Sequence, residues 1–209
     1  MKDNNYNIMK SKDIESESVE NKVLEEINEN DLDSKSKKND GKFKNFFKEW
    51  TLPIFAAIII AFLINKFLVY NVYIPSESMV PTLNIGDKLV VTRVYNKDKI
   101  ERGDIVVFYS DELQETLIKR VIGLPGDHIE IHNGIVNING DDIVEDYVKN
   151  NEEYNGVFDV PEGKYFFLGD NRRRSNDARR WINAYIDASD IQGEAKFKFY
   201  PLKDFGSLK

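Results

Sequence analysis

Hydrophobic and polar positions divide this chain into three parts. Residues 1–41 are mostly polar and charged, and their few apolar residues are too scattered to bury a core. Residues 52–74 are almost continuously apolar, whereas apolar and polar residues alternate in short runs through residues 75–209. This pattern predicts a disordered tail, one long apolar helix and a domain made mainly of β-strands. Helical spacing of apolar residues over 19–27 allows a short transient helix within the tail.

The apolar segment 52–74 is long enough to cross a membrane. At 1.5 Å per residue, a helix of this length spans about 30 to 35 Å, which matches the hydrocarbon core of a bilayer. Asn65 and Lys66 interrupt the run, so a helix buried inside a protein is the alternative, but Lys66 lies near one end and can extend its amine to the headgroups. Amphipathic rings suited to the headgroup level lie at both ends: Trp50, Tyr70 and Tyr73. We therefore expect a transmembrane helix.

Positive charge is distributed unequally about this segment. Residues 42–51 form a basic juxtamembrane segment, and beyond Lys66 no Lys or Arg occurs until Lys88. Because cytoplasmic flanks carry the excess of Lys and Arg, we expect the amino terminus in the cytoplasm and residues 75–209 on the extracytoplasmic side. A cleaved secretory signal fits poorly, since the polar stretch before the apolar run is far longer than the charged region of a signal peptide.

The alternating runs beyond the apolar segment predict strands. They are KLVVTRVY (88–95), DIVVFYS (104–110), TLIKRVIG (116–123), HIEIH (128–132), GIVNING (134–140), KYFFLGD (164–170) and AKFKFYP (195–201). Asn-Gly turns at 133–134 and 139–140 and further Pro-Gly turns separate several of them. Because helical patterns do not alternate with these runs, an antiparallel, mainly β domain is favoured over a parallel α/β sheet.

Composition narrows the chemistry that this domain can perform. The formal net charge of -7 over 209 residues argues against electrostatic attraction of the whole chain to nucleic acid. The sequence contains no cysteine, which excludes disulfides, thiol nucleophiles and cysteine-ligated metals. His128 and His132 are its two histidines, so few Ser-His-Asp triads are possible.

Neither histidine is well suited to accept the proton of a serine. Both flank Ile-Glu-Ile in HIEIH, where strand alternation puts the two imidazoles and Glu130 on one face, which we expect to be solvated. A metal site at these histidines is the functional alternative, but the pattern lacks the helical HExxH context and a convincing third ligand. We therefore expect a surface cluster, with no metal and no cofactor.

Lysine is the other side chain that can act as a base for serine, provided that burial disfavours its charged form. Lys119 lies in TLIKRVIG and shares one face of the predicted strand with Leu117 and Val121. Arg120 shares the opposite face with two isoleucines, so alternation does not decide which cation is buried. Arginine does not deprotonate in proteins, so Lys119 is the candidate base; an edge-strand or snorkelling lysine is the structural alternative.

Four segments, taken together, resemble the type I signal peptidases, membrane-bound serine proteases with a Ser/Lys dyad. PSESMVPTLNIGDKLVV resembles the serine box of the family, RGDIVVF its next strand, LIKRVIGLPGD its lysine box and GDNRRRSNDAR its fourth box. The segments occur in the family order after one apolar segment, and the similarity runs from about Leu52 to the closing IQGEAKFKFYP. The resemblance implies a signal-peptidase-like antiparallel β catalytic domain.

The resemblance also implies a role for each polar residue of these boxes. Ser78, immediately before Met79, corresponds to the nucleophile, and Lys119 corresponds to its general base. Ser76 corresponds to the residue whose hydroxyl forms the oxyanion hole with the backbone N–H of the nucleophile; a serine that only satisfies a turn is the alternative. Ser175 corresponds to a serine that hydrogen-bonds the lysine and orients it.

Substrate and supporting residues follow from the same motifs. The resemblance implies shallow apolar pockets for small substrate residues, involving Ile74, Met79, Leu83 and Ile118. It implies a supporting ion-pair network, in which Arg120 pairs with Asp170, made of Arg120, Asp170, Arg172, Asp177 and Arg179.

The chain departs from the family pattern at Arg173 and Arg174, where Asp-Asn is common, and at Ala178, which is often serine. Together with Arg179 and Arg180, the two arginines form a basic cluster in the sequence. Such a cluster can contact anionic lipid or nucleic acid, but an ordinary solvated loop is the interpretation that we favour.

The resemblance implies that the chain removes N-terminal signal peptides from exported preproteins at a bacterial cell membrane. Its expected partners are preproteins with small residues before the cut and the lipid bilayer, and nucleic acid is not expected among them. The rival hypotheses are a dedicated Ser/Lys processing peptidase, a self-cleaving regulator, and a catalytically impaired β domain that binds a partner. A self-cleaving regulator normally carries a DNA-binding module, and this sequence shows none.

Overall fold

The computed structural model describes residues 49–208, and the chain divides between Ala61 and Phe62 into two units. The predicted tail over 1–41, its possible helix over 19–27 and most of the basic segment over 42–51 lie outside the described residues.

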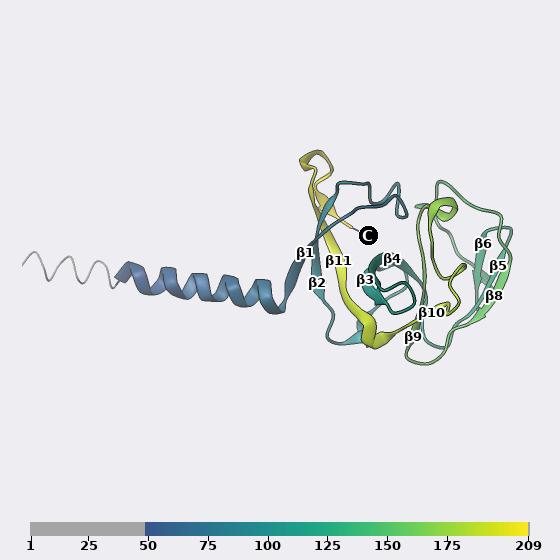
Figure 1. The fold of residues 1–209 in the computed structure, drawn as a ribbon, viewed down its shortest axis with the longest axis horizontal. Coiled ribbons are helices and arrows are strands. Elements are labelled where there is room, and N and C mark those ends of the chain that lie inside the picture. The colour runs from purple at the N-terminus through teal and green to yellow at the C-terminus, as the bar shows by residue number, and fades with distance from the viewer. Residues whose placement is uncertain (1–48, 209) are drawn as a thin grey trace, which may run out of the picture. The chain divides into compact units, whose positions relative to one another are not determined.

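A helix over Glu49–Phe67 begins the described chain (Figure 1). It has 19 residues and is long and apolar enough to cross a membrane. Its large apolar side chains are exposed, among them Phe55, Ile58 and Phe62. Exposed apolar residues on all sides of a helix are typical of a segment surrounded by lipid.

This helix ends earlier than the apolar pattern predicted. The prediction of one helix over 52–74 is wrong at its carboxyl end, where β1 (Val69–Tyr73) forms instead. β1 pairs antiparallel with β2 (Lys88–Arg93). The β-branched and aromatic residues of VYNVY favour a strand once a partner strand lies beside them, and apolar content alone does not distinguish the two outcomes.

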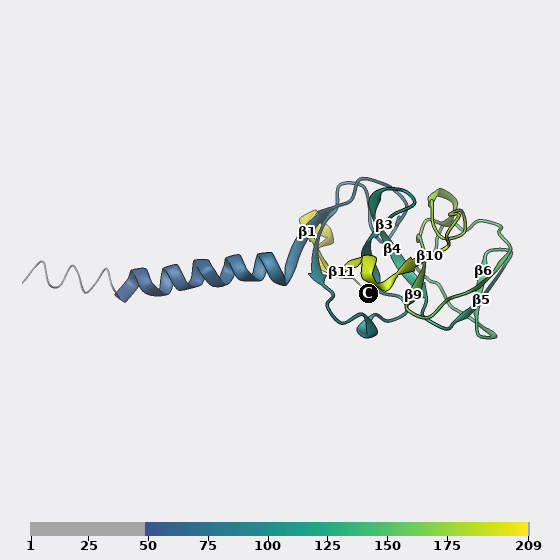
Figure 2. The ribbon, with the colours of Figure 1, turned by 60° about the horizontal axis from the view of Figure 1, so that its bottom comes forward.

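Antiparallel pairing joins eight strands into the larger sheet, in the order β1-β2-β11-β3-β4-β9-β10 with β12 beside β11. Figure 1 labels the seven strands of the main order, and Figure 2 shows the same ribbon turned by 60°. The remaining bounds are β3 (Ile105–Ser110), β4 (Glu115–Gly123), β9 (Lys164–Leu168), β10 (Tyr185–Asp187), β11 (Ile191–Tyr200) and β12 (Gly206–Ser207). β11 therefore brings the carboxyl-terminal part of the chain between β2 and β3. The predicted mainly antiparallel β domain is confirmed.

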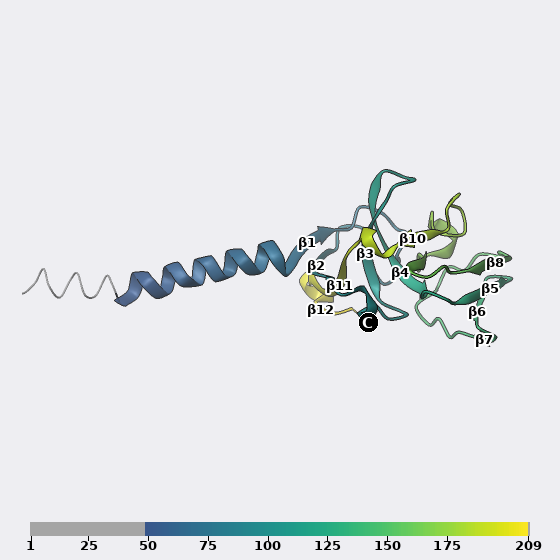
Figure 3. The same ribbon diagram turned by 90° about the horizontal axis from the view of Figure 1, so that it is seen from below.

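A second, four-stranded antiparallel sheet has the order β7-β6-β5-β8, and Figure 3 shows its strands together. Its strands are β5 (His128–His132), β6 (Ile135–Ile138), β7 (Asp141–Asp142) and β8 (Gly156–Asp159). The two predicted Asn-Gly turns connect β5 to β6 and β6 to β7. Both residues of each turn have positive φ, between 52° and 98°, which suits asparagine and glycine in tight hairpins.

Every predicted run contains a strand, but short strands escaped prediction. β7, β8, β10 and β12 have two to four residues each, too few to show alternation. Short 3-10 helices lie between strands: η1 (Lys97–Lys99), η2 (Arg172–Arg174), η3 (Ala188–Asp190) and η4 (Leu202–Asp204).

Two clusters of buried side chains support the domain. The larger cluster joins both sheets, and within it the rings of Phe108 and Phe167 stack with centroids 4.3 Å apart. The smaller cluster includes Met79 and Leu83, which pack with buried residues of β2 and β3. Because Met79 and Leu83 are fully buried, the loop between β1 and β2 is part of the core rather than a free surface loop.

Candidate active site

The loop over 74–87 carries both candidate serines and connects β1 to β2. The Ile74 N–H donates to the Asp87 carbonyl at 2.9 Å, which joins the two ends of the loop. Met79 anchors the middle of the loop in the smaller core cluster. The loop therefore holds Ser78, which precedes Met79 directly, close to the interior of the domain, where its side chain is buried.

Further contacts hold this loop against the segment that follows β9. The Asn171 N–H donates to the Ser78 carbonyl at 3.0 Å, and the Asn171 side-chain amide donates to the Glu77 carbonyl at 3.0 Å. The Thr82 hydroxyl donates to Asp170 Oδ2 at 2.5 Å. Ser78 is thus fixed both by the core and by residues 170–171.

Lys119 reaches Ser78 from β4. Its Nζ donates a hydrogen bond to Ser78 Oγ at 2.7 Å, although the two residues are 41 positions apart in the sequence. Lys119 is 3% exposed and Ser78 is 6% exposed. On β3, Val106 lies opposite Lys119 in the register and is fully buried. The structure therefore brings together, away from solvent, the two residues that the sequence singled out.

Burial lowers the pKa of Lys119 to about 8 from its usual 10.5, because the charged amine loses its hydration. The negative charges of Asp177, Glu115 and Asp170 act in the opposite direction. At pH 7 about one Lys119 amine in ten is then neutral, compared with about one in 3000 for an ordinary lysine. The hydrogen-bond partner of Nζ is a neutral hydroxyl, which is compatible with a neutral amine.

The two further serines differ in their surroundings. Ser76 is exposed, with its Oγ 3.4 Å from Ser78 Oγ. Ser175 is fully buried, but within residues 49–208 its hydroxyl forms no hydrogen bond, so the expected bond to Lys119 is absent. Ser175 packs instead against Gly169, where an added Cβ would lie 2.2 Å from Ser175 Oγ and 2.5 Å from the Ser78 carbonyl oxygen.

A cleft of about 270 Å³ opens beside Ser78 and Lys119. Residues 115–119 of β4 form one side, Pro75 and Ser76 line it near Ser78, and Arg174 and Asn176 complete it.

Among the four residues that the resemblance implied for substrate pockets, Ile118 lines this cleft. Ile74, Met79 and Leu83 are fully buried and belong to the smaller core cluster. These three side chains shape the loop that carries Ser78 and do not reach the surface of the cleft.

One edge of β4 is open along the cleft. β3 pairs with β4 from Glu115 to Arg120, whereas β9 pairs with it only from Arg120 to Gly123. Among the residues that the structure describes, the backbone of 116–118 therefore has no strand partner on the side opposite β3. This edge lies beside Ser78 and can accept an additional strand.

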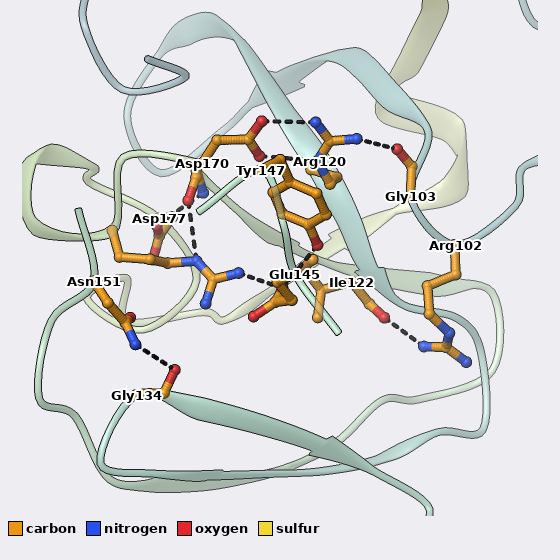
Figure 4. A network of polar contacts seen from close by, with 12 residues as sticks. Arg102, Gly103, Arg120, Ile122, Gly134, Glu145, Tyr147, Asn151, Asp170 and Asp177 are labelled. Atoms are coloured by element: carbon orange, nitrogen blue, oxygen red, sulfur yellow. Dashed lines mark hydrogen bonds and ion pairs between the residues drawn. The ribbon is translucent and has the colours of Figure 1, made fainter. Parts of the chain in front are cut away.

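Two buried ion pairs lie near Ser78 and Lys119. Arg120 binds Asp170 through two hydrogen bonds, and its third nitrogen donates to the Gly103 carbonyl at 2.7 Å (Figure 4). Asp177 binds Arg179 with Nε and Oδ1 2.8 Å apart, and accepts the Gly169 N–H at 3.0 Å. Both pairs agree with the ion-pair network that the resemblance implied.

Arg172 completes this network through residues that the sequence did not reveal. It pairs with Glu145, which also accepts the hydroxyl of Tyr147 at 2.7 Å. The Tyr147 ring lies 3.9 Å from the Arg120 guanidinium carbon (Figure 4). Glu145 and Tyr147 lie in a segment without a clear strand pattern; the available signal was that a buried arginine requires a nearby carboxylate.

The predicted basic cluster does not form as one surface. Arg179 is buried and paired, so only its neighbours Arg173, Arg174 and Arg180 are exposed. Arg174 pairs with Glu77 at 2.8 Å, and Arg180 pairs with Glu152 at 2.7 Å. Ala178 is buried in the larger core cluster. The solvated loop that we favoured is thus correct for the three exposed arginines but not for Arg179.

The histidines lie on the surface of β5, as alternation predicted. His128 Nδ1 is 2.6 Å from Asp159 Oδ1, and Glu130 contacts both imidazoles at 2.9 to 3.1 Å. Hydrogen bonds to Asp159 and Glu130 raise the pKa of His128. These contacts belong to the second sheet, and neither imidazole takes part in the bond between Ser78 and Lys119.

Comparisons with known proteins agree on one family. A family model described as signal peptidase, peptidase S26, matches residues 47–200. The probable signal peptidase I-1 of Synechocystis sp. is 39% identical over 173 residues, which cover 78% of this chain and 87% of the relative. The signal peptidase I of Bacillus licheniformis is 36% identical over 173 residues, which cover 77% of this chain and 92% of the relative.

A crystal structure of a signal peptidase I from Enterococcus faecalis V583 is also similar. It is 32% identical, with a TM-score of 0.42, over 46% of this chain and 96% of that chain. The family model covers most of the chain, and the two curated relatives match it over more than three quarters of its length. This chain therefore belongs to the signal peptidase family, peptidase S26.

Proposed function

We propose that this chain is a serine endopeptidase that removes signal peptides from preproteins, with Ser78 as nucleophile and Lys119 as general base. The hydrogen bond of 2.7 Å between Lys119 Nζ and Ser78 Oγ carries the proposal. Membership of the signal peptidase family supports the class of reaction. The lowered pKa of Lys119 supports its role, because only the neutral amine can accept a proton.

Proton transfer follows the contact between the two side chains. The neutral Lys119 amine accepts the hydroxyl proton while Ser78 Oγ attacks the scissile carbonyl carbon. When the C–N bond breaks, the Lys119 ammonium returns the proton to the departing amine, and the signal peptide stays bound to Ser78 as an ester. A water molecule, deprotonated by Lys119, then hydrolyses the ester and regenerates the Ser78 hydroxyl.

Ser76 and the Ser78 backbone stabilise the oxyanion of the tetrahedral intermediate in this proposal. The Ser76 hydroxyl lies 3.4 Å from Ser78 Oγ and is free to rotate toward an oxygen bound next to it. Within residues 49–208 the Ser78 N–H donates to no other backbone group, so it remains available as the second donor. Donors of this kind contribute about 3 to 4 kcal/mol each where water is excluded.

The substrate binds as an extended strand along the open edge of β4. Backbone groups of residues 116–118 supply hydrogen bonds, and the cleft beside them accepts the side chains before the cut. The resemblance implies small residues at the first and third of these positions. Ile118 then contacts the substrate directly, while Ile74, Met79 and Leu83 determine the shape of the site from within the core.

The helix Glu49–Phe67 anchors the enzyme in the bilayer in this proposal. The lysine-rich segment before the helix assigns the amino terminus to the cytoplasm, and therefore the β domain to the extracytoplasmic face. Signal peptides are apolar, so enzyme and substrate meet within the same membrane. Confinement to two dimensions raises their effective concentration without any new contact.

Cleavage of a preprotein that carries Ala-x-Ala before the cut tests the proposal. We would compare the full chain in detergent with Ser78→Ala, Lys119→Ala and a His128→Ala/His132→Ala double variant. We expect both dyad variants to lose cleavage and the histidine variant to retain it. Cleavage that survives either dyad change contradicts the assignment, and loss in the histidine variant alone would favour a histidine-dependent triad. A wild-type protein that binds the preprotein without cutting it would favour an impaired, partner-binding domain.

A further inference from the structure

We propose that Lys198 is a positioning residue for the nucleophile, which holds the Ser78 loop in place through Thr82 and Asp87. This inference rests on the proposed function and extends it to a buried lysine that lies outside the dyad. Lys198 belongs to β11, close to the carboxyl end of the chain, and its side chain is buried.

Lys198 contacts the loop over 74–87 at two points. Its Nζ donates to the Thr82 carbonyl at 3.1 Å and pairs with Asp87 Oδ2 at 2.5 Å. Thr82 is 116 residues away from Lys198 in the sequence, so the contact connects distant parts of the chain. Strand β11 thus fixes the second half of the loop over 74–87, whose first half carries Ser76 and Ser78.

Asp87 is the residue that closes the loop. Its carboxylate accepts the Asn84 N–H at 2.9 Å, and its carbonyl accepts the Ile74 N–H at 2.9 Å. The same carboxylate oxygen that binds Asn84 also binds Lys198. Removing the Lys198 amine would leave this carboxylate buried without its cation, at the point where the loop returns to the sheet.

Thr82 connects the loop to the strand of the general base. While its carbonyl accepts from Lys198, its hydroxyl donates to Asp170, which binds Arg120. Arg120 is the immediate neighbour of Lys119 on β4. One continuous set of polar contacts therefore runs from Lys198 through the loop over 74–87 to β4, the strand that carries the general base.

Stability alone is a weak reason for this arrangement. A buried ion pair is often no more stabilising than apolar side chains of similar volume, because both charges lose their hydration. Correct positioning is a stronger reason: a displacement of about 1 Å at a catalytic group can lower the rate about a hundredfold. The Lys198 contacts restrict movement of the loop relative to β11, and the Thr82–Asp170 bond restricts it relative to the segment after β9.

Two variants of the full chain in detergent test this role with the preprotein substrate. Lys198→Met removes the cation at similar length, and Thr82→Val removes the hydroxyl at similar volume. At a pH where Lys119 is neutral, we expect kcat to fall at least about tenfold in each, with KM changed less than about twofold. Lys198→Arg and Thr82→Ser keep the donor atoms and are expected to recover most of the loss.

Arg102→Met is the matched control. Arg102 pairs with Asp127 at 3.0 Å and donates to the Ile122 carbonyl, and neither partner belongs to the loop over 74–87. We expect this variant to lose stability without a tenfold fall in kcat. If Lys198→Met keeps the kcat of the control at a temperature below all unfolding transitions, the positioning role of Lys198 is wrong and its contacts are structural only.

Hydrogen exchange gives a second measurement that does not depend on activity. The Leu83 N–H donates to the Met79 carbonyl and the Gly86 N–H donates to the Ile74 carbonyl, so both amides report on the loop. We expect faster exchange at these amides in Lys198→Met and Thr82→Val, and no change there in Arg102→Met. Unchanged exchange in Lys198→Met would overturn the inference. Ser78→Ala separates the two proposals, because cleavage by that variant contradicts the proposed function whatever the loop does.

Discussion

Arg120 and Asp170 form an ion pair through two hydrogen bonds in the interior of the domain. Nε lies 2.9 Å from Oδ1 and Nη2 lies 2.7 Å from Oδ2, and the two side chains are 2% and 1% exposed. Burial acts to lower the pKa of Arg120, but the hydrogen bonds and charge of Asp170 outweigh it and raise the pKa. Its neighbour Lys119 is equally buried but bonds to a hydroxyl. Adjacent cations on one strand therefore have opposite properties, one permanently charged and one able to lose its proton.

The rate of cleavage should depend on the protonation of Lys119. Its pKa of about 8 means that the neutral base becomes more abundant as pH rises through 8. We expect kcat/KM to increase about tenfold from pH 6 to pH 7 and to level off above about pH 9. The pH profile of the purified enzyme checks this, with the His128→Ala/His132→Ala variant as control. A flat profile between pH 6 and pH 9 would exclude Lys119 as the titrating base.

Lys119→Met should abolish cleavage and yet stabilise the protein at neutral pH. Lys119 has a lower pKa in the folded than in the unfolded chain, so between pH 8 and 10.5 the unfolded chain binds more protons and stability rises with pH. Below pH 8 the folded state carries the full cost of a buried charge, at most about 3 kcal/mol. Methionine removes that cost, and we expect a free energy of unfolding higher by about 1 to 3 kcal/mol at pH 7.

Urea denaturation at pH 7 and at pH 10 measures this difference. The increase in the free energy of unfolding that methionine gives should be smaller at the higher pH, because the lysine amine of wild type is then neutral in the folded state. If Lys119→Met has a lower free energy of unfolding than wild type at pH 7, burial of the charged amine does not destabilise the folded protein.

Removing Arg120 should destabilise the domain strongly. Arg120→Met leaves the Asp170 carboxylate buried without its cation, and loss of one partner of a buried pair costs about 3 to 5 kcal/mol. Arg174→Met is the matched control, because its pair with Glu77 is largely exposed and such pairs contribute about 1 kcal/mol or less. Urea denaturation of both variants compares the two costs. Equal decreases in the free energy of unfolding of the two variants would mean that burial of the Arg120 pair has no energetic consequence.

Gly169→Ala should disturb Ser78, the proposed nucleophile. The added Cβ would lie 2.2 Å from Ser175 Oγ and 2.5 Å from the Ser78 carbonyl oxygen, closer than real Cβ atoms approach other atoms. We expect kcat to fall at least tenfold and stability to fall by about 1 to 3 kcal/mol, as in other overpacked cores. Steady-state kinetics and urea denaturation measure the two effects. Gly206→Ala, where an added Cβ meets nothing within 4 Å, should leave both unchanged.

Much of the domain could be predicted from local pattern. Alternation of apolar residues located the longer strands, and the Asn-Gly pairs located two hairpin turns, because both signals depend only on neighbours in sequence. Lys119 was a candidate base because so few other bases fit the composition, and Ser78 was assigned by resemblance to a local family motif. Both roles stay predictions, and the structure places the two side chains in contact. The roles of Ser76 and Ser175 were suggested by resemblance and stay predictions, and the expected bond from Ser175 to Lys119 is not formed.

Other features depended on which distant segments pack together. The apolar pattern of residues 69–73 fits both a helix and a strand, and pairing with β2 decides that they form a strand. Lys196 and Lys198 alternate with phenylalanines in the sequence. The pairing of β11 with β2 contains β-bulges, and in the structure Lys196 is exposed whereas Lys198 contacts the loop over 74–87. Local pattern placed them on the same face and had no means to separate them.

Sequence by itself therefore determined the strand-rich architecture and the apolar helix, and it singled out Ser78 and Lys119 as the candidate dyad. Tertiary structure decided that Lys119 and Arg120 are both buried, that one bonds to a hydroxyl and the other to a carboxylate, and that Lys198 holds the loop. The physical reason is that a strand pattern describes only one chain segment. The charge state and position of a polar group depend on all the segments that remove its water and supply its hydrogen bonds.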